Sequence, residues 1–589
     1  IDTLRRRFSK YAPGPESFEL DSAQIAEPPL RNLTPKHHVL HYGADGVARL
    51  LAGFRTPGAA HPDTATLLVL AEVLDSASHG VGASLYRNKQ WVSSVGVSHG
   101  YLVDHGQFTV RAELSPEKSG AVTTWLKRFL TSISDESFSA EAVREAAMRV
   151  LVHRARRWER FGEQAQELGF LFERMGYQSA SALTARVLAQ TPETLAAVAR
   201  KYFQPNMYVE ALQLPRGATA GPPEEIATHR GVASAPRNLL SRIRADNVEP
   251  PIGWRVAEQQ TEQEITRFRF NNGFELLVQS TYASPTLTAV AHIAGGQWVE
   301  RPAEAGIGAL TMRTLTSGTQ HLTVAEWDRT IEAGGLISTS NIELGDRSNV
   351  NRNVFMRDGS TYALSGTAQQ MPLIVSLVGE AIYRPVFPEK EVEKVRASMR
   401  TEVRTLKNNN LEYIKQEFYR HIFPGHPYGR STIGSEATLS SIGATAVREH
   451  HARTYSPDRT TLAVVGPVLP GHVLRAVQTS MADIPSEKLG PIPSSLEYTP
   501  PALGTQQLSL GRSQRCINFG GPTLPARHAA FEVLEVLMTV ARGHHFYKYV
   551  YDLGVSYRSW IRLWPHRHHS TWIVENDIAK KGFQNTLSE

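Results

Sequence analysis

The chain contains two internal repeats, and they limit its possible folds more than any other feature of the sequence. The segment GFRTPGAAHPDTATLLVLAEVL, which contains Pro57, returns as NFGGPTLPARHAAFEVLEVL, with Pro522 in the matching place 465 residues later. A shorter repeat relates the segment that starts at Phe138 to the segment that starts at Phe387, 249 residues later. Long, fixed spacings are typical of chains built from copies of one folding unit, and they predict a row of related half-units of roughly 200 to 250 residues.

The beginning of the chain also takes part in the repeats. LRRRFSKYAPGP, from Leu4, resembles VLRAVQTSMADIP near residue 480, which closes a half-unit. Ile1 stands where a complete translation product has Met. We therefore expect a fragment of a longer protein, which begins with the tail of a half-unit whose front is absent.

The coarse pattern of helices and strands predicts an α+β fold. Short apolar runs bounded by turn residues predict strands, among them VARLLAGFRTPG, VSSVGVSHGYLVDHGQFTVRAEL, FELLVQS, TLTAVAHIAGG and TLAVVGPV. Longer amphipathic segments predict helices, one beginning near Ser115 and Pro116 and one beginning after Pro388. This order predicts mostly antiparallel sheets, each with helices packed on one face.

Composition excludes several classes of protein. The 589 residues are 41% hydrophobic and 20% charged, which is typical of two to four ordinary globular domains. The single cysteine, Cys516, excludes an intramolecular disulfide framework and a thiolate metal cluster. No apolar run reaches the roughly 20 residues of a membrane helix, so we expect no membrane span. The net charge of +6 is spread along the chain without interleaved aromatic residues, so we expect no nucleic-acid partner.

One segment carries a specific family resemblance. The segment HIFPGHPYGRSTIGSEATLSSIGATAVREHHARTYSPDRTTLAVVGPV, from His421 to Val468, resembles the pitrilysin/insulinase family of zinc metallopeptidases in the order and spacing of its motifs. NNGFELLVQSTYASPTLTAVAHIAGG upstream resembles the opening strand and hairpin of that family, and the likeness covers nearly the whole chain. The resemblance implies the fold of the mitochondrial-processing-peptidase and LuxS-like metallohydrolases, in a two-unit protein of the bacterial type.

The resemblance also implies boundaries between half-units. Residues 1–25 would end a truncated first half-unit, residues 26–245 would form the second, residues 250–485 the third, and residues 490–589 an incomplete fourth. In this family the chemistry belongs to H-x-x-E-H on the helix after the first hairpin, in which two imidazoles at i and i+4 hold zinc and the Glu activates the bound water. A second, distant Glu completes the zinc ligands.

The matching helix of this chain, GIGALTMRTLTSGT from Gly306, departs from that motif. The two His positions fall on Ala309 and Arg313, and the Glu position falls on Met312. None of these side chains can hold zinc or act as the base. The distant ligand would fall near Glu391 or Glu393, which we interpret as solvated residues of a charged helix. We therefore predict no catalytic residue and no bound metal in this chain, and we expect zinc in the missing N-terminal half-unit.

The histidines outside this helix offer no replacement for the motif. Neither H-x-x-E-H nor H-E-x-x-H occurs among the 22 histidines, and the nearest approach, at Glu449, His450 and His451, has Ala446 in the place of the first ligand. His566, His568 and His569 form a tight cluster, which we interpret as an exposed polar edge rather than a metal site. His544 and His545 are interpreted as loop histidines.

The last half-unit holds one candidate substrate contact. Active members of the family use an Arg and a Tyr there to hold the substrate carbonyl, in a segment like L-x-x-x-x-R-E-x-x-G-L-x-Y. FYKYVYDLGVSY keeps Gly554 and Tyr557 but has Val550 in place of the Arg. The resemblance thus implies that Tyr557 hydrogen-bonds a substrate carbonyl, and the alternative is a tyrosine that only packs.

Two functions of different classes follow from these observations. In the first, the chain is the non-catalytic region of an insulinase-like zinc endopeptidase, supplies chamber walls and contacts to peptide substrates, and is inactive alone. In the second, it is a catalytically inactive family member that serves as a partner or scaffold subunit of an active peptidase, either a homologous catalytic chain or a homodimer. By resemblance to exported bacterial relatives, we expect a periplasmic location.

Overall fold

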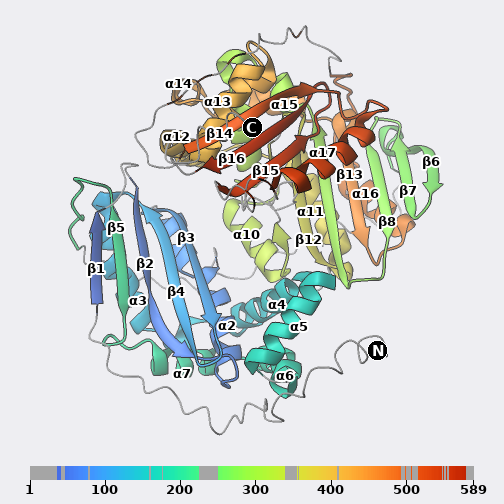
Figure 1. Ribbon diagram of the computed structural model, residues 1–589. Coiled ribbons are helices and arrows are strands. Elements are labelled where there is room, and N and C mark those ends of the chain that lie inside the picture. The colour runs from blue at the N-terminus through green and yellow to red at the C-terminus, as the bar shows by residue number, and fades with distance from the viewer. Residues whose placement is uncertain are drawn as a thin grey trace, which may run out of the picture. The chain divides into compact units, whose positions relative to one another are not determined.

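The computed structural model describes residues 36–41, 47–76, 80–89, 91–157, 161–175, 177–223, 250–338, 354–355, 357–406, 410–492, 515–546 and 556–578, and residues 498, 504, 506, 508, 548 and 552. The chain divides into two compact units, one formed mainly by residues up to Arg237 and the other mainly by residues from Asn238 onward. Figure 1 shows the elements of both units.

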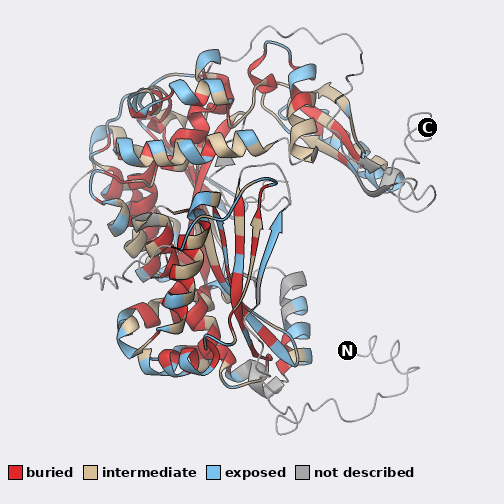
Figure 2. Cartoon of the chain, turned by 90° about the vertical axis from the view of Figure 1, so that its left-hand side faces the viewer, coloured by how far each residue is buried: buried red, intermediate tan, exposed pale blue. Residues whose placement is uncertain are grey.

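The first unit is built on a five-stranded sheet in the order β1-β5-β2-β4-β3. Its strands are β1 (Lys36–His41), β2 (Ala48–Pro57), β3 (Val92–Tyr101), β4 (His105–Leu114) and β5 (Val209–Leu214). All neighbours pair antiparallel except β1 and β5, which are parallel. Strand β4 alternates between buried and mostly exposed side chains, as in a sheet with one covered face, whereas most side chains of β2 are buried (Figure 2).

Helices cover the buried face of this sheet. They are α2 (Thr64–Asp75), α3 (Ser119–Thr131), α4 (Ala140–Arg157), α5 (Phe161–Met175), α6 (Tyr177–Leu188) and α7 (Pro192–Tyr202), with a π-helical turn at Gly82–Asn88 and 3-10 turns at Pro116–Lys118 and Asp135–Ser137. The helix expected near Ser115 begins as the 3-10 turn and continues as α3. Its predicted apolar face, Val122, Trp125 and Phe129, is buried.

The second unit contains an eight-stranded sheet in the order β10-β12-β9-β13-β8-β7-β6, with β11 also paired to β12. Its strands are β6 (Val256–Glu262), β7 (Ile265–Phe270), β8 (Glu275–Ser280), β9 (Thr286–Ala294), β10 (Ile337–Ser338), β11 (Val354–Phe355), β12 (Gly359–Thr367) and β13 (Thr460–Gly466). Strands β13 and β8 pair in parallel, whereas β10 and β11 with β12, β13 with β9, β6 with β7, and β7 with β8 pair antiparallel.

The helices that accompany this sheet are α9 (Ile307–Thr314), α11 (Met371–Tyr383), α12 (Glu389–Thr405), α13 (Asn410–Ile422), α14 (Glu436–Ser441), α15 (Ala444–Thr454) and α16 (Pro470–Met481). Helix α10 (Val324–Ala333) belongs mostly to the first unit, which includes Asp328–Leu336. Short 3-10 turns lie at Ile252–Trp254, Gly296–Val299, Pro302–Glu304, Ala368–Gln370, Pro427–Gly429 and Pro457–Arg459. The helix expected after Pro388 is α12, and its apolar residues Val392 and Met399 are buried.

The last part of the second unit is a three-stranded antiparallel sheet with one helix. Strands β14 (Arg515–Thr523), β15 (Ser556–Trp564) and β16 (Ser570–Ile578) are ordered β14-β16-β15, and α17 (Phe531–Phe546) packs on β15. Helix α13 packs against β14 and so connects this sheet to the rest of the second unit. The predicted α+β class, with antiparallel-rich sheets and packed helices, is confirmed.

Candidate functional site

Helix α9 carries the three positions of the altered metal motif. Gly306 precedes it with a φ of +94°, a conformation that favours glycine, and a Cβ there would lie 2.8 Å from the backbone of Gly434. The buried carboxylate of Glu300 accepts hydrogen bonds from the backbone N–H groups of Gly306 (3.4 Å) and Gly308 (2.9 Å). The Glu300 side chain thus accepts hydrogen bonds from backbone N–H groups at the start of α9 that have no partner within the helix.

Burial dominates the chemistry of Glu300. Loss of solvation raises the pKa of its carboxyl to about 8, although the two backbone donors and nearby Arg430 act in the opposite direction. A raised carboxyl pKa destabilises the folded chain progressively as pH rises from about 4.5, the ordinary value, to about 8. Its hydrogen bonds point to the start of α9, so Glu300 holds the helix rather than a ligand.

The motif positions on α9 are occupied by packing and ion-pair contacts. Ala309 and Met312 are buried, and the hydroxyl of Tyr455 donates to the Sδ atom of Met312 at 3.0 Å. The Nη1 atom of Arg313 lies 2.8 Å from the Oε2 atom of Glu402 on α12, with both side chains less than one third exposed. A cation–carboxylate pair therefore joins α9 to α12 at this position.

These residues do not fit a zinc ion. Neither the methyl group of Ala309 nor the guanidinium of Arg313 can donate a lone pair to a metal, and Met312 cannot accept a proton from water. Within the described ranges, no group of three or more His, Cys, Asp or Glu side chains is arranged to hold a metal ion.

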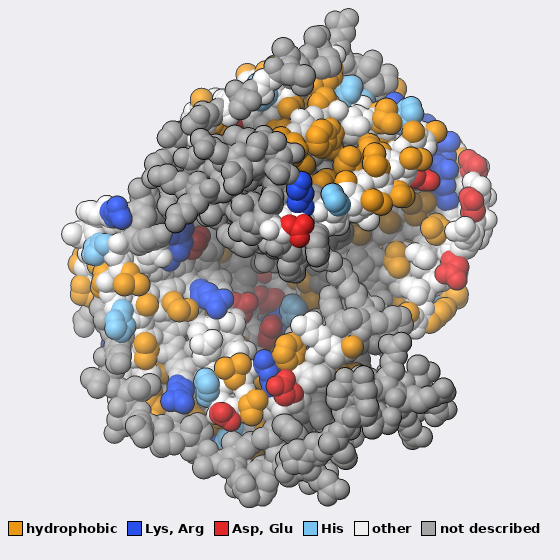
Figure 3. All heavy atoms as spheres, viewed as in Figure 1, with side chains coloured by type: hydrophobic (Ala, Val, Ile, Leu, Met, Phe, Trp, Pro, Cys, Tyr) orange, Lys and Arg blue, Asp and Glu red, His pale blue; other side chains and the backbone are white. Residues whose placement is uncertain are grey.

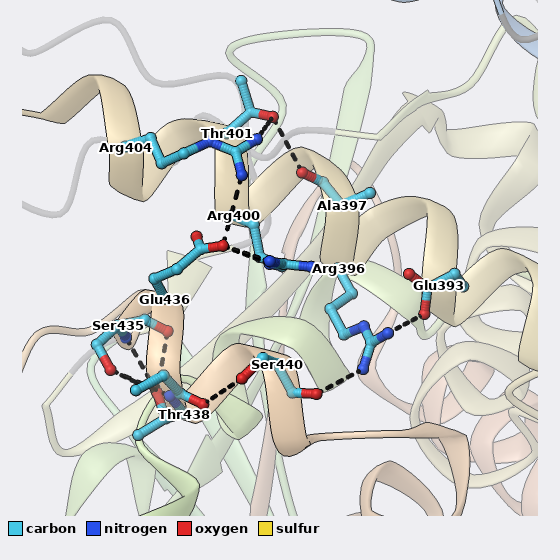
Figure 4. Close-up of polar contacts among 11 residues, drawn as sticks. Glu393, Arg396, Ala397, Arg400, Thr401, Arg404, Ser435, Glu436, Thr438 and Ser440 are labelled. Carbon is cyan, nitrogen blue, oxygen red and sulfur yellow. Dashed lines mark hydrogen bonds and ion pairs between the residues drawn. The ribbon is translucent and has the colours of Figure 1, made fainter.

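The two carboxylates expected near the distant ligand position lie at the start of α12. Glu393 is ion-paired with Arg396 on its own helix and is 54% exposed, whereas Glu391 is half-buried (Figure 4). Glu402, two to three helical turns further along, is the carboxylate that reaches α9. The sequence did not single out Glu402, because its pairing depends on the packing of two helices that are distant in the chain.

The other side of α12 is tied to α14. Arg396 donates to the backbone oxygens of Ser440 (3.3 Å) and Ile442 (3.0 Å). Arg400 and Arg404, one and two turns further along α12, both pair with Glu436 (Figure 4). Polar contacts thus hold α12 between α9 and α14, and the altered motif lies in a rigid helical layer.

A second cluster surrounds the turn between β15 and β16. The interpretation of His566, His568 and His569 as an exposed polar edge is wrong for His568, which is 9% exposed and stacks on Trp298 with ring centroids 3.8 Å apart. His566 and His569 are half-buried. The turn packs against an earlier part of the second unit that includes Trp298, so His568 is a packing residue.

Asp358 anchors this turn to the preceding half-unit. It accepts hydrogen bonds from the backbone N–H of Arg567 (2.8 Å) and from the hydroxyl of Tyr428, and its carboxylate lies 3.6 Å from Nδ1 of His566. These three contacts hold the pKa of the Asp358 carboxyl below its ordinary value despite its burial. Beside it, Arg357 donates to Gln297 and to the backbone oxygen of Tyr428.

His426, in the H-P-Y-G-R segment, packs in the same cluster. Its Nδ1 atom accepts the backbone N–H of Tyr428 at 3.2 Å, and its ring lies 5.2 Å from Trp298 and 5.8 Å from His569, centroid to centroid. Burial, together with the nearby His569, His568 and Arg430, lowers the pKa of His426 to about 4. The ring is therefore neutral near pH 7 and serves as a hydrogen-bond acceptor.

The remaining candidates lie in the last part of the chain. Tyr557 is in β15, but its side chain is outside the described residues, as are Val550 and Gly554. The interpretation of His544 and His545 as loop histidines is wrong, because both belong to α17, where His544 is exposed. Cys516 lies on β14 and is half-buried. Across the part of the chain that the structure describes, no helix is long and apolar enough to cross a membrane.

The sequence is similar to one family model and to several curated proteins. The model described as the peptidase M16 inactive domain matches residues 2–150 and 441–559. The alpha subunit of the mitochondrial-processing peptidase of Solanum tuberosum is 22% identical over 215 residues, which cover 36% of this chain and 39% of that protein. An uncharacterized zinc protease of Mycobacterium bovis is 25% identical over 112 residues, which cover 19% of this chain and 26% of that protein. The chain therefore spans about two fifths or less of the length of these relatives.

The periplasmic protease PqqL from Escherichia coli aligns with 95% of this chain and 63% of its own, at 12% sequence identity and a TM-score of 0.47.

Proposed function

Because the chain belongs to the M16 family of peptidases, which contains pitrilysin and insulinase, we propose that it is the non-catalytic part of a zinc metalloendopeptidase. The H-x-x-E-H helix of that enzyme would lie in a half-unit outside the present sequence, and zinc would bind there. In this proposal the half-units described above form walls of the chamber in which peptides are hydrolysed.

The proposal rests on the residues that stand on α9 in place of the zinc ligands and the catalytic base. Its three motif positions hold Ala309, Met312 and Arg313, and Arg313 is paired with Glu402. A zinc peptidase needs a metal to lower the pKa of water and a base to take its proton, and these residues supply neither. The helix is retained as a packing element, which suits a half-unit that shapes the enzyme without catalysing the reaction.

The contact with substrate is assigned to the last half-unit. We propose that Tyr557 on β15 donates a hydrogen bond to a carbonyl of the bound peptide, as the family segment around it implies. Such a donor contributes to binding and to stabilising the charge that develops on the carbonyl oxygen. A periplasmic location is part of the same proposal and rests on resemblance to exported family members.

A second function is favoured by one comparison. The relative from Solanum tuberosum is named as a subunit of a processing peptidase, so a related chain can act as one part of an assembly. In this alternative the chain is an inactive partner or scaffold, which pairs with a homologous catalytic chain or with a second copy of itself.

The first experiment measures zinc content and cleavage of quenched peptides by the chain from Ile1 to Glu589. We expect no stoichiometric zinc and no cleavage above background. Tight zinc binding together with proteolysis that a chelator abolishes would contradict the proposal.

The second experiment separates the two functions by means of the longer protein. An H-x-x-E-H motif encoded roughly 150 to 200 residues before Ile1 supports the enzyme, and a second altered motif supports the scaffold. In the longer enzyme, Tyr557→Phe should lower kcat/KM by about a hundredfold, as loss of one donor to the developing oxyanion does. Ser559→Ala on the same strand is the matched control and should leave kcat/KM within about twofold.

A further inference from the structure

The five-stranded sheet of the first unit has a face that its core does not use. The core side chains of β2 and β4 are Leu50, Ala52, Phe54, Phe108, Val110 and Ala112. Side chains alternate between the two sides of a strand, so the residues between these point the other way, to a side that we call the open face. There Leu51, Arg55 and Arg111 are exposed. In Figure 1 this sheet lies in front of its helices, and Figure 3 looks onto the same side, where Lys and Arg side chains stand among uncharged ones.

The charges on the open face of β2 and β4 do not cancel. Arg49 lies opposite Glu113, and the two side chains form an ion pair at 3.2 Å. Arg55 and Arg111 are the other two charged residues on this face of these strands. Among the described residues, neither guanidinium has a hydrogen bond or an ion pair. The open face therefore presents two positive charges that no carboxylate of the described chain balances.

The sheet of the second unit treats its arginines differently. Arg267 on β7 is paired with Glu275 on β8, and the Nε atom of Arg269 lies 4.0 Å from the same carboxylate. Opposite charges on neighbouring strands are ordinary for a solvated sheet face. Unbalanced charges such as Arg55 and Arg111 instead create a positive potential, which attracts an anionic ligand.

The strand register fixes the separation of these two arginines. Arg111 lies opposite Leu51, and Arg55 is four residues further along β2. Four residues of a strand span roughly 13 Å. An extended peptide that runs along the strands turns every second side chain to the same side, so its residues i and i+4 match this separation.

The surface between the two arginines is low. Gly53, which has no side chain, lies opposite Thr109, and Thr109 lies opposite Ser98 on β3. The hydroxyl groups of Ser98 and Thr109 are hydrogen-bonded to each other at 3.0 Å. Short side chains at this place allow the middle of a peptide to approach the sheet, while its ends reach the two guanidinium groups.

We propose that the open face of the five-stranded sheet binds an extended acidic peptide, with one carboxylate at Arg111 and a second carboxylate, four residues away, at Arg55. This inference rests on the proposed function, in which the chain contacts peptide substrates, and it adds the class of substrate. A guanidinium matches a carboxylate through two parallel N–H···O bonds, which gives the contact its geometry. Because both arginines are solvated, each contact contributes selectivity more than affinity.

The test measures fluorescence anisotropy of labelled, acetylated and amidated peptides with the chain from Ile1 to Glu589. The probe peptide has two glutamates four residues apart in an uncharged sequence. One reference peptide has glutamines at these places, and the other has its two glutamates three residues apart. We expect the probe to bind about threefold more tightly than either reference at low ionic strength, and we expect salt at about 0.5 M to remove the difference. Equal affinities for the three peptides would overturn the proposal, as would tighter binding of a single-stranded oligonucleotide of the same charge.

Substitutions locate the contact. Arg55→Gln and Arg111→Gln should each weaken binding of the probe about threefold and leave binding of the glutamine reference unchanged. Arg128→Gln is the matched control, because Arg128 is exposed on α3, which packs on the core side of the sheet. It removes the same charge and should change binding by less than about 1.5-fold.

A reversal of charge gives a result that a purely structural role would not produce. The double variant Arg55→Glu, Arg111→Glu should prefer a probe with two lysines four residues apart to the glutamate probe. An unchanged preference for glutamates would show that the acidic peptide binds elsewhere, and the proposal would be wrong.

These measurements need neither zinc nor cleavage, so their outcome is separate from that of the proposed function. Selective binding of the acidic peptide by a protein whose longer form lacks H-x-x-E-H would leave the surface in place and contradict the peptidase. Cleavage by the longer enzyme without selective binding here would contradict this inference alone.

Discussion

At the scale of single residues, Arg313 determines whether α9 can bind a metal ion. A guanidinium keeps its proton under all ordinary conditions and has no lone pair to give, so this position is closed to metal chemistry. Its pairing with Glu402 turns the same position into a link between two helices. The residue that removes the catalytic motif thus also contributes to the packing of the half-unit.

The strength of this link can be measured with a double-mutant cycle. Arg313→Ala and Glu402→Ala should each destabilise the chain, and their coupling free energy should be about 1 kcal/mol, since both side chains are partly screened by solvent. The measurement is denaturant unfolding of the wild type, the two single variants and the double variant. Arg200 and Asp135, an ion pair in which both side chains are more than half exposed, give the matched cycle, in which we expect coupling near zero.

The altered motif could be read from the sequence because it depends only on helical spacing. Positions 309, 312 and 313 are fixed relative to one another by a single helix, and the structure places all three on α9. Glu402 could not be found in the same way, because it lies 89 residues from Arg313 along the chain. Its role follows from how α12 packs against α9, which no local pattern encodes.

At the scale of elements, the turn between β15 and β16 connects the last sheet to earlier residues of the second unit. His568 stacks on Trp298, and Asp358 accepts the backbone N–H of Arg567. A turn of this composition is expected to be solvated when only its own residues are considered. The misinterpretation of its histidines arose because the aromatic and acidic partners lie more than 200 residues earlier in the chain.

Removal of the stacked ring should weaken this connection. We expect His568→Ala to reduce the free energy of unfolding of the second unit by about 1 to 2 kcal/mol, through loss of a buried aromatic contact. Arg567→Ala is the matched control and should cost less than about 0.5 kcal/mol, because the contact with Asp358 uses the backbone of this residue. Equal losses in chemical denaturation of the two variants would show that the stacking carries no stability.

At the scale of the whole molecule, buried histidines make the fold sensitive to acid. Burial lowers the pKa to about 3 for His99 and His450 and to about 4 for His426 and His451. The unfolded chain binds protons at these rings below about pH 6.5, whereas the folded chain does not. Stability therefore falls as pH decreases from about 6.5 towards 4.

One substitution isolates the contribution of a single ring. His426→Asn keeps a side-chain oxygen that can accept the backbone N–H of Tyr428 but removes the titration. We expect the variant to lose less stability than the wild type between pH 6.5 and pH 4, as measured by thermal unfolding at fixed ionic strength. Parallel pH profiles for the two proteins would contradict this assignment.

The general architecture was accessible from the sequence for a physical reason. Alternating apolar residues, turn residues and amphipathic helices are local signals, and they predicted β2, β3, β4, β8, β9 and β13 at their observed places. The exposure of Val533, Val536, Leu537 and Val540 on α17 could not be recognised in the same way, because the valines of a helix look the same in sequence whether or not another element covers them. Burial depends on tertiary neighbours, which a local pattern does not encode.

The pairing of Arg313 with Glu402 has a further consequence for how this part of the protein assembles. Both charges are part of the polypeptide, so the junction of α9 and α12 can form as soon as the chain folds, whatever the cellular supply of divalent cations. A chelator should therefore leave the contact between α9 and α12 unchanged. The contact between these two helices therefore does not depend on a bound ion.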